Sequence, residues 1–330
     1  MSARLAAGPV ALLAALAIVL QVSADGGTSG AASDSGARAA TVTGGAIRHR
    51  LYLPGLAVGE TAPPPAEDPP PDERFLGLEK ALADTVAAYG VDGLYGVAVT
   101  DLQTGQTIGV DGARPQRAGC LMNLFVIIET VREVQAGALP LQAVDGLIRQ
   151  TIWASDATTA RELYEIIGGG EVIAGVGKVE RLLHETLKLD AAVIDHPPAY
   201  PEWSLGISGE NWTTAEAMNS ALGALYRGEL LNSEWTNYLL EAMRLVKPGL
   251  NYLTANLPEE AVVSHKNGFF WAEDGYIDND TAIVRFEAGG QWYAYAITFV
   301  SEQVDEEYAD IWLGRDLVRM TWEYFRAVYG

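Results

Sequence analysis

Cysteine and lysine are both scarce in this chain. Cys120 is the only cysteine in 330 residues, so an intrachain disulfide is excluded. Lysine and arginine together number 22, against 43 aspartate and glutamate residues, and the formal net charge is −21. A nucleic-acid binder needs a basic surface to neutralise phosphates. The composition therefore argues against nucleic acid as a partner, and the acidic balance favours solubility.

Long apolar runs are also few, and the clearest one lies at the N-terminus. Arg4 precedes the apolar stretch 5–22, and Val22-Ser23-Ala24 provides small residues for cleavage. These features are typical of a secretory signal peptide. The alternative is an uncleaved membrane anchor, because about 18 apolar residues can just span a bilayer. We therefore expect an exported protein, extracellular or in the cell envelope, that meets the membrane only through residues 1–24 if they remain.

Residues 25–72 have the composition of a linker. Gly, Ala, Ser and Thr dominate residues 25–45, which predicts a flexible tether, and the proline triplets in 60–72 predict a stiff extended spacer. A short apolar island within 46–59 has no assigned role beyond a docking strand. We expect a single folded domain over residues 73–330.

Hydrophobic periodicity within that domain predicts a mixed α/β fold of the α+β type. Helices are expected over 75–89 and 305–329, and several more between 120 and 250. Alternating patterns predict strands at the following ranges: 94–100, 106–110, 261–270, 281–287 and 291–300. The pattern favours one five-stranded antiparallel sheet flanked by the terminal helices, plus an all-helical lobe. A cleft between the two lobes is a natural place for a site.

Three short stretches carry the candidate chemistry. They are Ala-Gly-Cys-Leu-Met-Asn (118–123), Ser-Asp-Ala (155–157) and His-Lys-Asn-Gly (265–268). The first opens a predicted buried helix, and residues three apart on a helix share a face. The third lies on an apolar strand, where the glycine permits a close approach to the backbone.

In order and setting, these stretches resemble the S-x-x-K, S-D-N and K-T-G motifs of class A β-lactamases and penicillin-binding serine hydrolases. The resemblance implies a β-lactamase/transpeptidase-like fold. It places Cys120 at the nucleophilic serine and Asn123 at the lysine, and it gives proton transfer to Ser155 and anchoring of a substrate carboxylate to Lys266. These four residues are the candidate catalytic residues.

The same resemblance implies substrate contacts from Asp156, Asn267 and Gly268, whereas Ala157 replaces the amide that binds substrate in the family. The stretches 212–217, 225–231 and 278–284 also resemble family segments in the correct order. The glutamate that serves deacylation has no clear counterpart, and Glu202 is the nearest candidate for this base.

Each stretch also has a purely structural interpretation. Cys120 is equally typical of a small buried apolar residue. Ser155-Asp156 has the composition of a helix cap, and Lys266 that of a solvated lysine at a sheet edge. His184, Asp195 and His196 lack metal-ligand spacing, so surface histidines are expected, with no metal and no cofactor.

The sequence therefore predicts an exported hydrolase-family domain that retains a small-molecule or peptidoglycan-like peptide ligand and has weakened acyl-transfer activity. A second hypothesis is an active thiol acyl-enzyme that uses Cys120, because a thiol ionises more readily than a hydroxyl. A variant of this hypothesis makes Ser155 the nucleophile and Lys266 its base. The third is a cell-surface binding or structural module on a stalk.

Overall fold

The computed structural model describes residues 72–250 and 253–330, all of which belong to one compact unit. The expectations for residues 1–71, namely the signal or anchor and the linker, lie outside the described residues. The first described helix begins at Glu73. Within the described ranges, every helix is too short or too polar to cross a membrane.

A five-stranded antiparallel sheet is the centre of the fold, as predicted from the sequence. Its strand order is β2-β1-β7-β6-β5. The strands are β1 (Leu94–Asp101), β2 (Thr107–Val110), β5 (Val262–Ala272), β6 (Gly275–Ala288) and β7 (Gln291–Glu302). Strand β6 begins six residues earlier than predicted, because a tight turn after Ala272 pairs that residue directly with Gly275.

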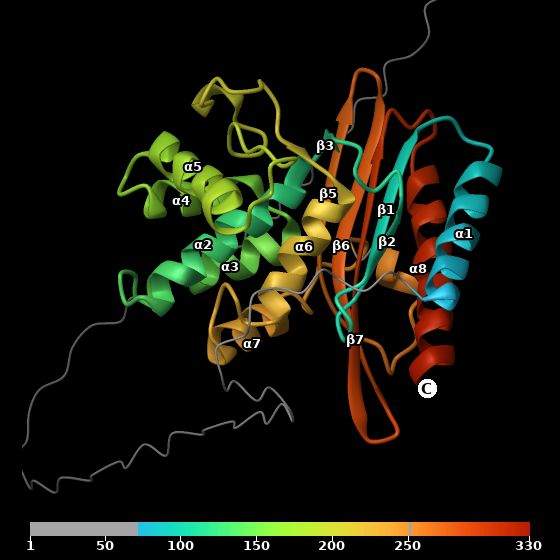
Figure 1. The fold of residues 1–330 in the computed structure, drawn as a ribbon. Coiled ribbons are helices and arrows are strands. Elements are labelled where there is room, and N and C mark those ends of the chain that lie inside the picture. Colours follow the sequence, from blue (N-terminus) through green and yellow to red (C-terminus); the bar gives the residue numbers. More distant parts are fainter. Residues whose placement is uncertain (1–71, 251–252) are drawn as a thin grey trace, which may run out of the picture. The chain divides into compact units, whose positions relative to one another are not determined.

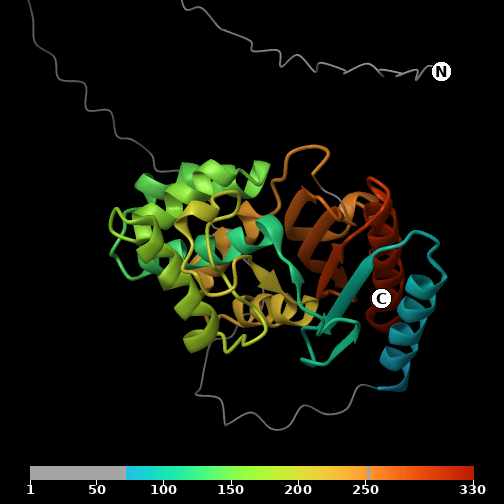
Figure 2. The ribbon, with the colours of Figure 1, turned by 90° about the horizontal axis from the view of Figure 1, so that it is seen from above.

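Two helices cover one face of the sheet and α6 packs on the other (Figure 1). The covering helices are α1 (Glu73–Ala88) and α8 (Ala309–Tyr329), from the two ends of the described chain. Figure 2 shows the remaining helices gathered on the side of the sheet away from α1 and α8. These helices are α2 (Asn123–Gln135), α3 (Leu141–Ala154), α4 (Ala157–Ile167), α5 (Val172–Arg181), α6 (Ala215–Tyr226) and α7 (Ser233–Ala242).

Short elements connect these layers. They are the two-stranded pair β3 (Gln116–Arg117) and β4 (Trp212–Thr213), the 3₁₀ turns η1 (Gly119–Met122), η3 (Pro201–Trp203) and η4 (Leu253–Asn256), and the π-helical turn η2 (Leu182–Thr186). The helix predicted from Cys120 thus divides into η1 and α2. Leu121 donates its backbone N–H to the carbonyl of Ala118, an i→i−3 bond typical of 3₁₀ geometry. Gly119 has a φ of +53°, which turns the chain sharply at this point.

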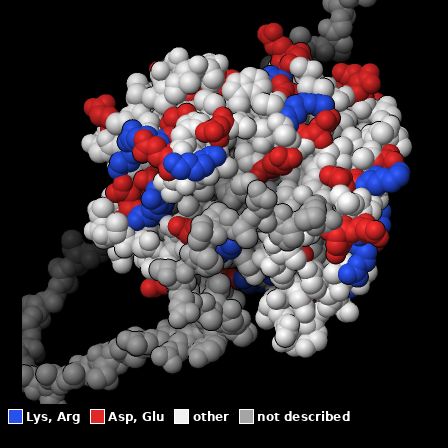
Figure 3. Space-filling model, viewed as in Figure 1, with Lys and Arg blue, Asp and Glu red and all other residues white. Residues whose placement is uncertain are grey.

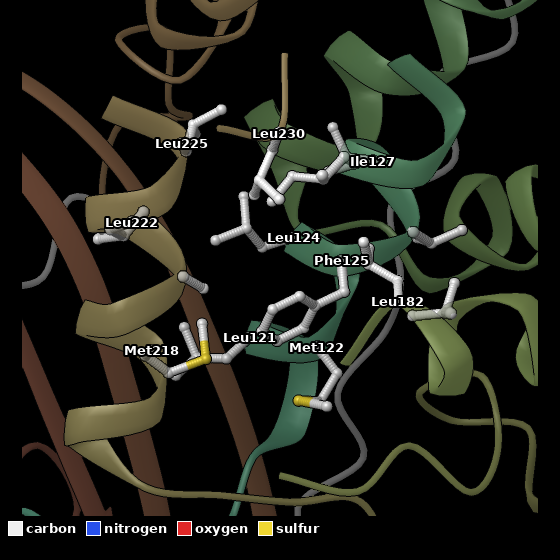
Figure 4. Close-up of a cluster of buried hydrophobic side chains, with 14 of the residues drawn as sticks. Leu121, Met122, Leu124, Phe125, Ile127, Leu182, Met218, Leu222, Leu225 and Leu230 are labelled. Atoms are coloured by element: carbon white, nitrogen blue, oxygen red, sulfur yellow. The ribbon is translucent and has the colours of Figure 1, made fainter. Parts of the chain in front are cut away.

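The helical lobe has its own apolar core, and helix α2 runs through it. Figure 4 shows Leu124 and Phe125 of this helix packed toward Leu222 and Met218 of α6. Leu121, one residue after Cys120, is also completely buried. Burial of such side chains stabilises the fold by about 1.5–3 kcal/mol each. The segment that carries Cys120 is therefore fixed by the core immediately behind it.

Charge is dispersed on the visible surface. On the face drawn in Figure 3, lysine and arginine side chains lie among aspartate and glutamate side chains, without a broad basic area. This distribution agrees with the acidic composition.

Candidate active site

The backbone before Cys120 is held from two directions. Ala118 donates its N–H to the carbonyl of Asn211, at 2.9 Å. From the sheet, the Asn279 side-chain amide donates to the carbonyls of Arg117 and Ala118, at 3.0 and 3.2 Å. These bonds tie the segment to both the 195–211 loop and strand β6.

Arg117 adds an ionic anchor to the same segment. Its guanidinium donates to Glu302 at 2.6 Å and to Asp274 at 2.7 Å. Its cationic centre also lies 5.8 Å from the ring centre of Phe270. Because Glu302 ends β7 and Asp274 lies in the β5–β6 turn, Cys120 sits beside a well-anchored corner of the sheet.

Strand β5 passes directly against the backbone of Cys120. A β-carbon placed on Gly268 would lie 2.6 Å from the amide nitrogen of Leu121 and 3.0 Å from that of Cys120. Real side chains do not approach this closely, so only glycine fits. The cysteine and the His-Lys-Asn-Gly stretch, far apart along the chain, therefore meet in space.

Lys266 lies two residues before this contact and is fully buried. Its ammonium is 2.5 Å from the Ser155 hydroxyl and also donates to the Asn267 carbonyl. Complete burial lowers the pKa of Lys266 to about 8, while the negative charges of a Cys120 thiolate and of Asp280 act in the opposite direction. The ammonium is thus within electrostatic reach of the sulfur.

Ser155 and Asp156 have different tasks. Ser155 ends α3 in a left-handed conformation, with φ 53° and ψ 37°. This conformation accompanies a side chain that receives the Lys266 hydrogen bond and donates to the Asn267 carbonyl at 3.2 Å. Asp156 begins α4, and its carboxylate accepts from the Thr159 N–H at 2.9 Å. Asp156 is therefore a helix cap, whereas the Ser155 side chain is bonded to Lys266 and Asn267.

Several buried polar groups in this region have no hydrogen-bond partner among the described residues. They include both side-chain polar atoms of Asn123 and of Asn267, and the hydroxyl of Tyr164. Burial, and then the charge of a Cys120 thiolate, raise the pKa of Tyr164 well above its usual value. Buried polar groups are ordinarily paired, so these orphaned groups mark a place where water or a ligand completes the bonding.

A cavity of about 300 Å³ opens beside Cys120. Its walls include Phe269 and Phe270 from β5 and, from the 195–211 loop, His196 and Glu210. This volume lies at the lower end of the range typical of small-molecule sites. The lining is mainly apolar, with a few polar side chains that include His196 and Glu210, so the cavity suits a largely apolar ligand with polar groups.

His196 and Glu210 were not predicted as site residues, and the expectation of a surface histidine is wrong for His196, which is 6% exposed. The physical reason is Asn211, whose side chain binds the backbone of His196 on both sides, accepting from its N–H and donating to its carbonyl. The sequence around His196 does not reveal its burial, because Asn211, which binds its backbone, follows 15 positions later in an irregular loop.

Glu202 lies in η3 and is exposed. Its neighbour Pro201 lines the cavity, whereas Glu202 is not among the lining residues. Within the described part of the chain, no group of three or more His, Cys, Asp or Glu side chains has an arrangement that could hold a metal ion.

Comparison with known proteins identifies the family and the fold. The sequence profile of the beta-lactamase enzyme family matches residues 142–325, a region that begins after Cys120 and Asn123. Beta-lactamase VEB-1 of Pseudomonas aeruginosa is 23% identical over 187 residues, which cover 55% of this chain and 59% of that relative.

Solved structures show the same fold. A beta-lactamase from Chitinophaga pinensis has a TM-score of 0.63 and 19% identity, covering 75% of this chain and 98% of its own. The TLA-3 extended-spectrum beta-lactamase has a TM-score of 0.64 and 18% identity, covering 75% and 99%. The predicted resemblance is confirmed, and the chain belongs to the beta-lactamase enzyme family.

Proposed function

We propose that this chain is an exported member of the family that binds an acyl-amide ligand, either a β-lactam or a peptidoglycan-like peptide, beside Cys120, and that hydrolyses β-lactams only weakly. One observation carries the proposal. Asn123, which the family resemblance puts at the place of the motif's lysine, is fully buried with both polar atoms unpartnered by the described residues.

The chemical reason is the loss of a base beside the nucleophile. A carboxamide neither accepts a proton nor carries a positive charge at neutral pH. General acid–base help contributes about 10²–10⁴-fold to such reactions. A thiol at position 120 recovers part of this factor, because it is more acidic and more nucleophilic than a hydroxyl.

Ligand binding relies on groups that remain in place. Lys266 is fully buried and does not line the cavity, so its ammonium attracts a ligand carboxylate by its charge and not by contact. The buried Asn267 amide, unpartnered by the described residues, supplies a donor and an acceptor for a bridging water. Gly268 lets the strand approach closely. Ala157 lacks the amide that would hold the ligand from the opposite side, so we expect binding weaker than at an intact site.

Turnover of a chromogenic cephalosporin tests this function. The wild-type chain, Cys120→Ser, Asn123→Lys and the double variant are compared by kcat/KM, with the melting temperature measured for each. We expect kcat/KM for the wild type well below the 10⁴–10⁸ M⁻¹s⁻¹ typical of enzymes, and a rise of at least about 10²-fold in the double variant. Efficient wild-type turnover, or a folded double variant with no gain, would contradict the proposal.

A second candidate function, an active thiol acyl-enzyme, is favoured by the contact between Lys266 and Ser155. Lys266 and Ser155 could pass a proton to or from Cys120, the candidate nucleophile, which lies in the anchored turn η1. The intact mass of the chain after exposure to the cephalosporin distinguishes the candidates, because a transient adduct that disappears in Cys120→Ala and accompanies turnover requires the thiol. An adduct that persists in Cys120→Ala would point to Ser155 as the nucleophile.

Export is the part of the proposal that rests on the N-terminal sequence alone. Residues 1–24 have the charge, apolar core and small-residue end of a signal peptide. Expression of the full chain in a bacterium, followed by fractionation and N-terminal sequencing, tests this. A mature N-terminus at Asp25 outside the cytoplasm supports export, and an intact Met1 in the cytoplasm contradicts it.

A further inference from the structure

We propose that His196, with Glu210 beside it, is the proton-transfer residue for Cys120 in a thiol-dependent acyl transfer. This inference rests on the second candidate function above and names the group that serves its thiol. The three side chains line one cavity of about 300 Å³. A nucleophile, an imidazole and a carboxylate that line one cavity have the composition of an activated nucleophile.

Asn211 fixes these three components relative to one another. Its carbonyl accepts from Ala118, two residues before Cys120. Its side chain clasps the backbone of His196, at 3.2 and 2.9 Å. Its own N–H donates to the Glu210 carboxylate at 2.9 Å. One buried residue thus holds the nucleophile's segment, the imidazole and the carboxylate in a single hydrogen-bonded unit.

The hydrogen bonding of His196 determines which nitrogen is the base. Its Nδ1 lies 2.9 Å from the Pro197 carbonyl, which only accepts, so Nδ1 carries the proton. In the neutral ring, Nε2 therefore holds the lone pair. It lies 3.6 Å from a Glu210 oxygen, too far for a good hydrogen bond but near enough for the carboxylate to stabilise an imidazolium.

Lys266 does not exchange protons with groups inside the cavity. Its ammonium is fully buried, binds the Ser155 hydroxyl and the Asn267 carbonyl, and is not among the residues that line the cavity. A water molecule or a leaving amine inside the cavity meets the imidazole instead.

The proposed step is balanced as follows. The Cys120 sulfur attacks the ligand carbonyl and a carbon–sulfur bond forms, while the thiol proton passes to His196 Nε2, directly or through one water. The carbon–nitrogen bond then breaks, and Nε2 returns the proton to the leaving amine. Water attacks the resulting thioester, and its proton passes through Nε2 to the departing thiolate. Neither oxidant nor metal is required.

Acylation of the full chain by p-nitrophenyl acetate tests the proposal without depending on ligand recognition. The Cys120→Ala chain gives the background acylation of amines and hydroxyls, so the part of the p-nitrophenolate burst and of the intact-mass increase that this variant loses reports Cys120, the only cysteine. At pH 6.5 we expect His196→Gln to lower the acylation rate about 10²-fold and Glu210→Gln to lower it less. His184→Gln is the matched control, since His184 pairs with Glu180 away from the cavity. This variant should keep the wild-type rate.

Alkylation by iodoacetamide separates activation from misfolding. The charged or titratable groups facing the thiol are Lys266, Tyr164, His196 and Glu210, and Asp195 adjoins the imidazole. The rate for His196→Gln should fall at least tenfold at pH 6.5 and match the wild type at pH 9.5, where solvent hydroxide replaces the histidine as the base.

Unchanged acylation and alkylation at pH 6.5 in a folded His196→Gln chain would overturn the proposal. If this variant does not fold, an unchanged rate in Glu210→Gln overturns it instead. Failure of the proposed function would give a different result. The wild type would then neither bind nor turn over cephalosporins, yet His196→Gln would still lower the reactivity of Cys120, and the proton-transfer pair would stand.

Discussion

The Lys266 ammonium and the Ser155 hydroxyl lie 2.5 Å apart, although 111 residues separate them in the sequence. The contact joins a strand of the sheet to the end of α3 in the helical lobe. It brings a fully buried cation to the backbone region that also carries Cys120. The relationship has consequences for stability as well as for chemistry.

Burial of Lys266 makes stability depend on alkaline pH. The folded chain releases this proton near pH 8, whereas the unfolded chain retains it to about 10.5. Between these values the unfolded state binds more protons, so the free energy of unfolding rises with pH, by up to about 1.4 kcal/mol per unit. Urea unfolding at pH 7.5, 8.5 and 9.5 should show this rise in the wild type and in Lys80→Met, an exposed control. The rise should be absent in Lys266→Met. An equal rise in that variant would show that Lys266 is not the group responsible.

A buried carboxyl pair has the opposite pH dependence. Burial, followed by the negative charge of Asp310, raises the pKa of Asp278 to about 8. Asp310 accepts from the Ser301 hydroxyl and the Ile311 N–H, so it is the better holder of the negative charge. Asp278 therefore keeps its proton in the folded chain, and stability should fall as pH rises from about 4 to about 8.

Asp278→Asn should remove most of that fall, because the amide stays neutral. Compared with the wild type, the variant should gain free energy of unfolding between pH 5 and pH 8. Asp316→Asn, on the exposed side of the same helix as Asp310, is the control and should leave the slope unchanged. A wild-type stability that is flat across this pH range would contradict a protonated Asp278 in the folded chain.

Gly268→Ala should disturb the nucleophile's backbone. Its β-carbon would collide with the amide nitrogens of Leu121 and Cys120, and overpacking of this kind destabilises a protein by about 1–3 kcal/mol. We expect a lower melting temperature and altered Cys120 alkylation. Gly146→Ala on α3 has open space at the same atom and should be neutral or stabilising. Equal melting temperatures for the two variants would show that the strand does not press on the turn.

Asn211→Ala should loosen the 195–211 loop. It removes a side chain that makes three hydrogen bonds to the backbones of Asp195 and His196. At about 1 kcal/mol for each bond, we expect a loss of about 2 kcal/mol or more, with faster proteolysis inside the loop. Asn232→Ala removes the cap of α7, so it should lose a comparable amount without cleavage in the loop. A 195–211 loop that resists proteolysis in Asn211→Ala as well as in the wild type would show that the Asn211 side chain does not hold the loop in place.

The order of the secondary-structure elements was predictable because it depends on local patterns. Alternation marked β1, β5 and β7, and Asp101-Leu102-Gln103-Thr104-Gly105 marked the first hairpin turn. Convergence of Cys120, Ser155 and Lys266 was predictable only through the family resemblance, since no local pattern reports a contact across more than a hundred residues.

The other side of the cavity could not be predicted in this way. His196, Glu210 and Asn211 lie in a loop without period, and side-chain bonds to backbone groups hold them together. Such bonds leave no signature in hydrophobicity or spacing. The 3₁₀ turn at Cys120 was missed for a similar reason, because the apolar run continues through the change from one helix type to the other.

The most direct test of the account is whether an acyl-amide ligand shields Cys120. Iodoacetamide labels the single thiol of the full chain, and the intact mass gives the rate with increasing amounts of a cephalosporin. We predict a slower, saturable rate in the wild type and weaker protection in Lys266→Met, which lacks the buried positive charge that attracts the ligand carboxylate. A thiol that reacts at the same rate at every cephalosporin concentration would contradict a ligand site at this cavity.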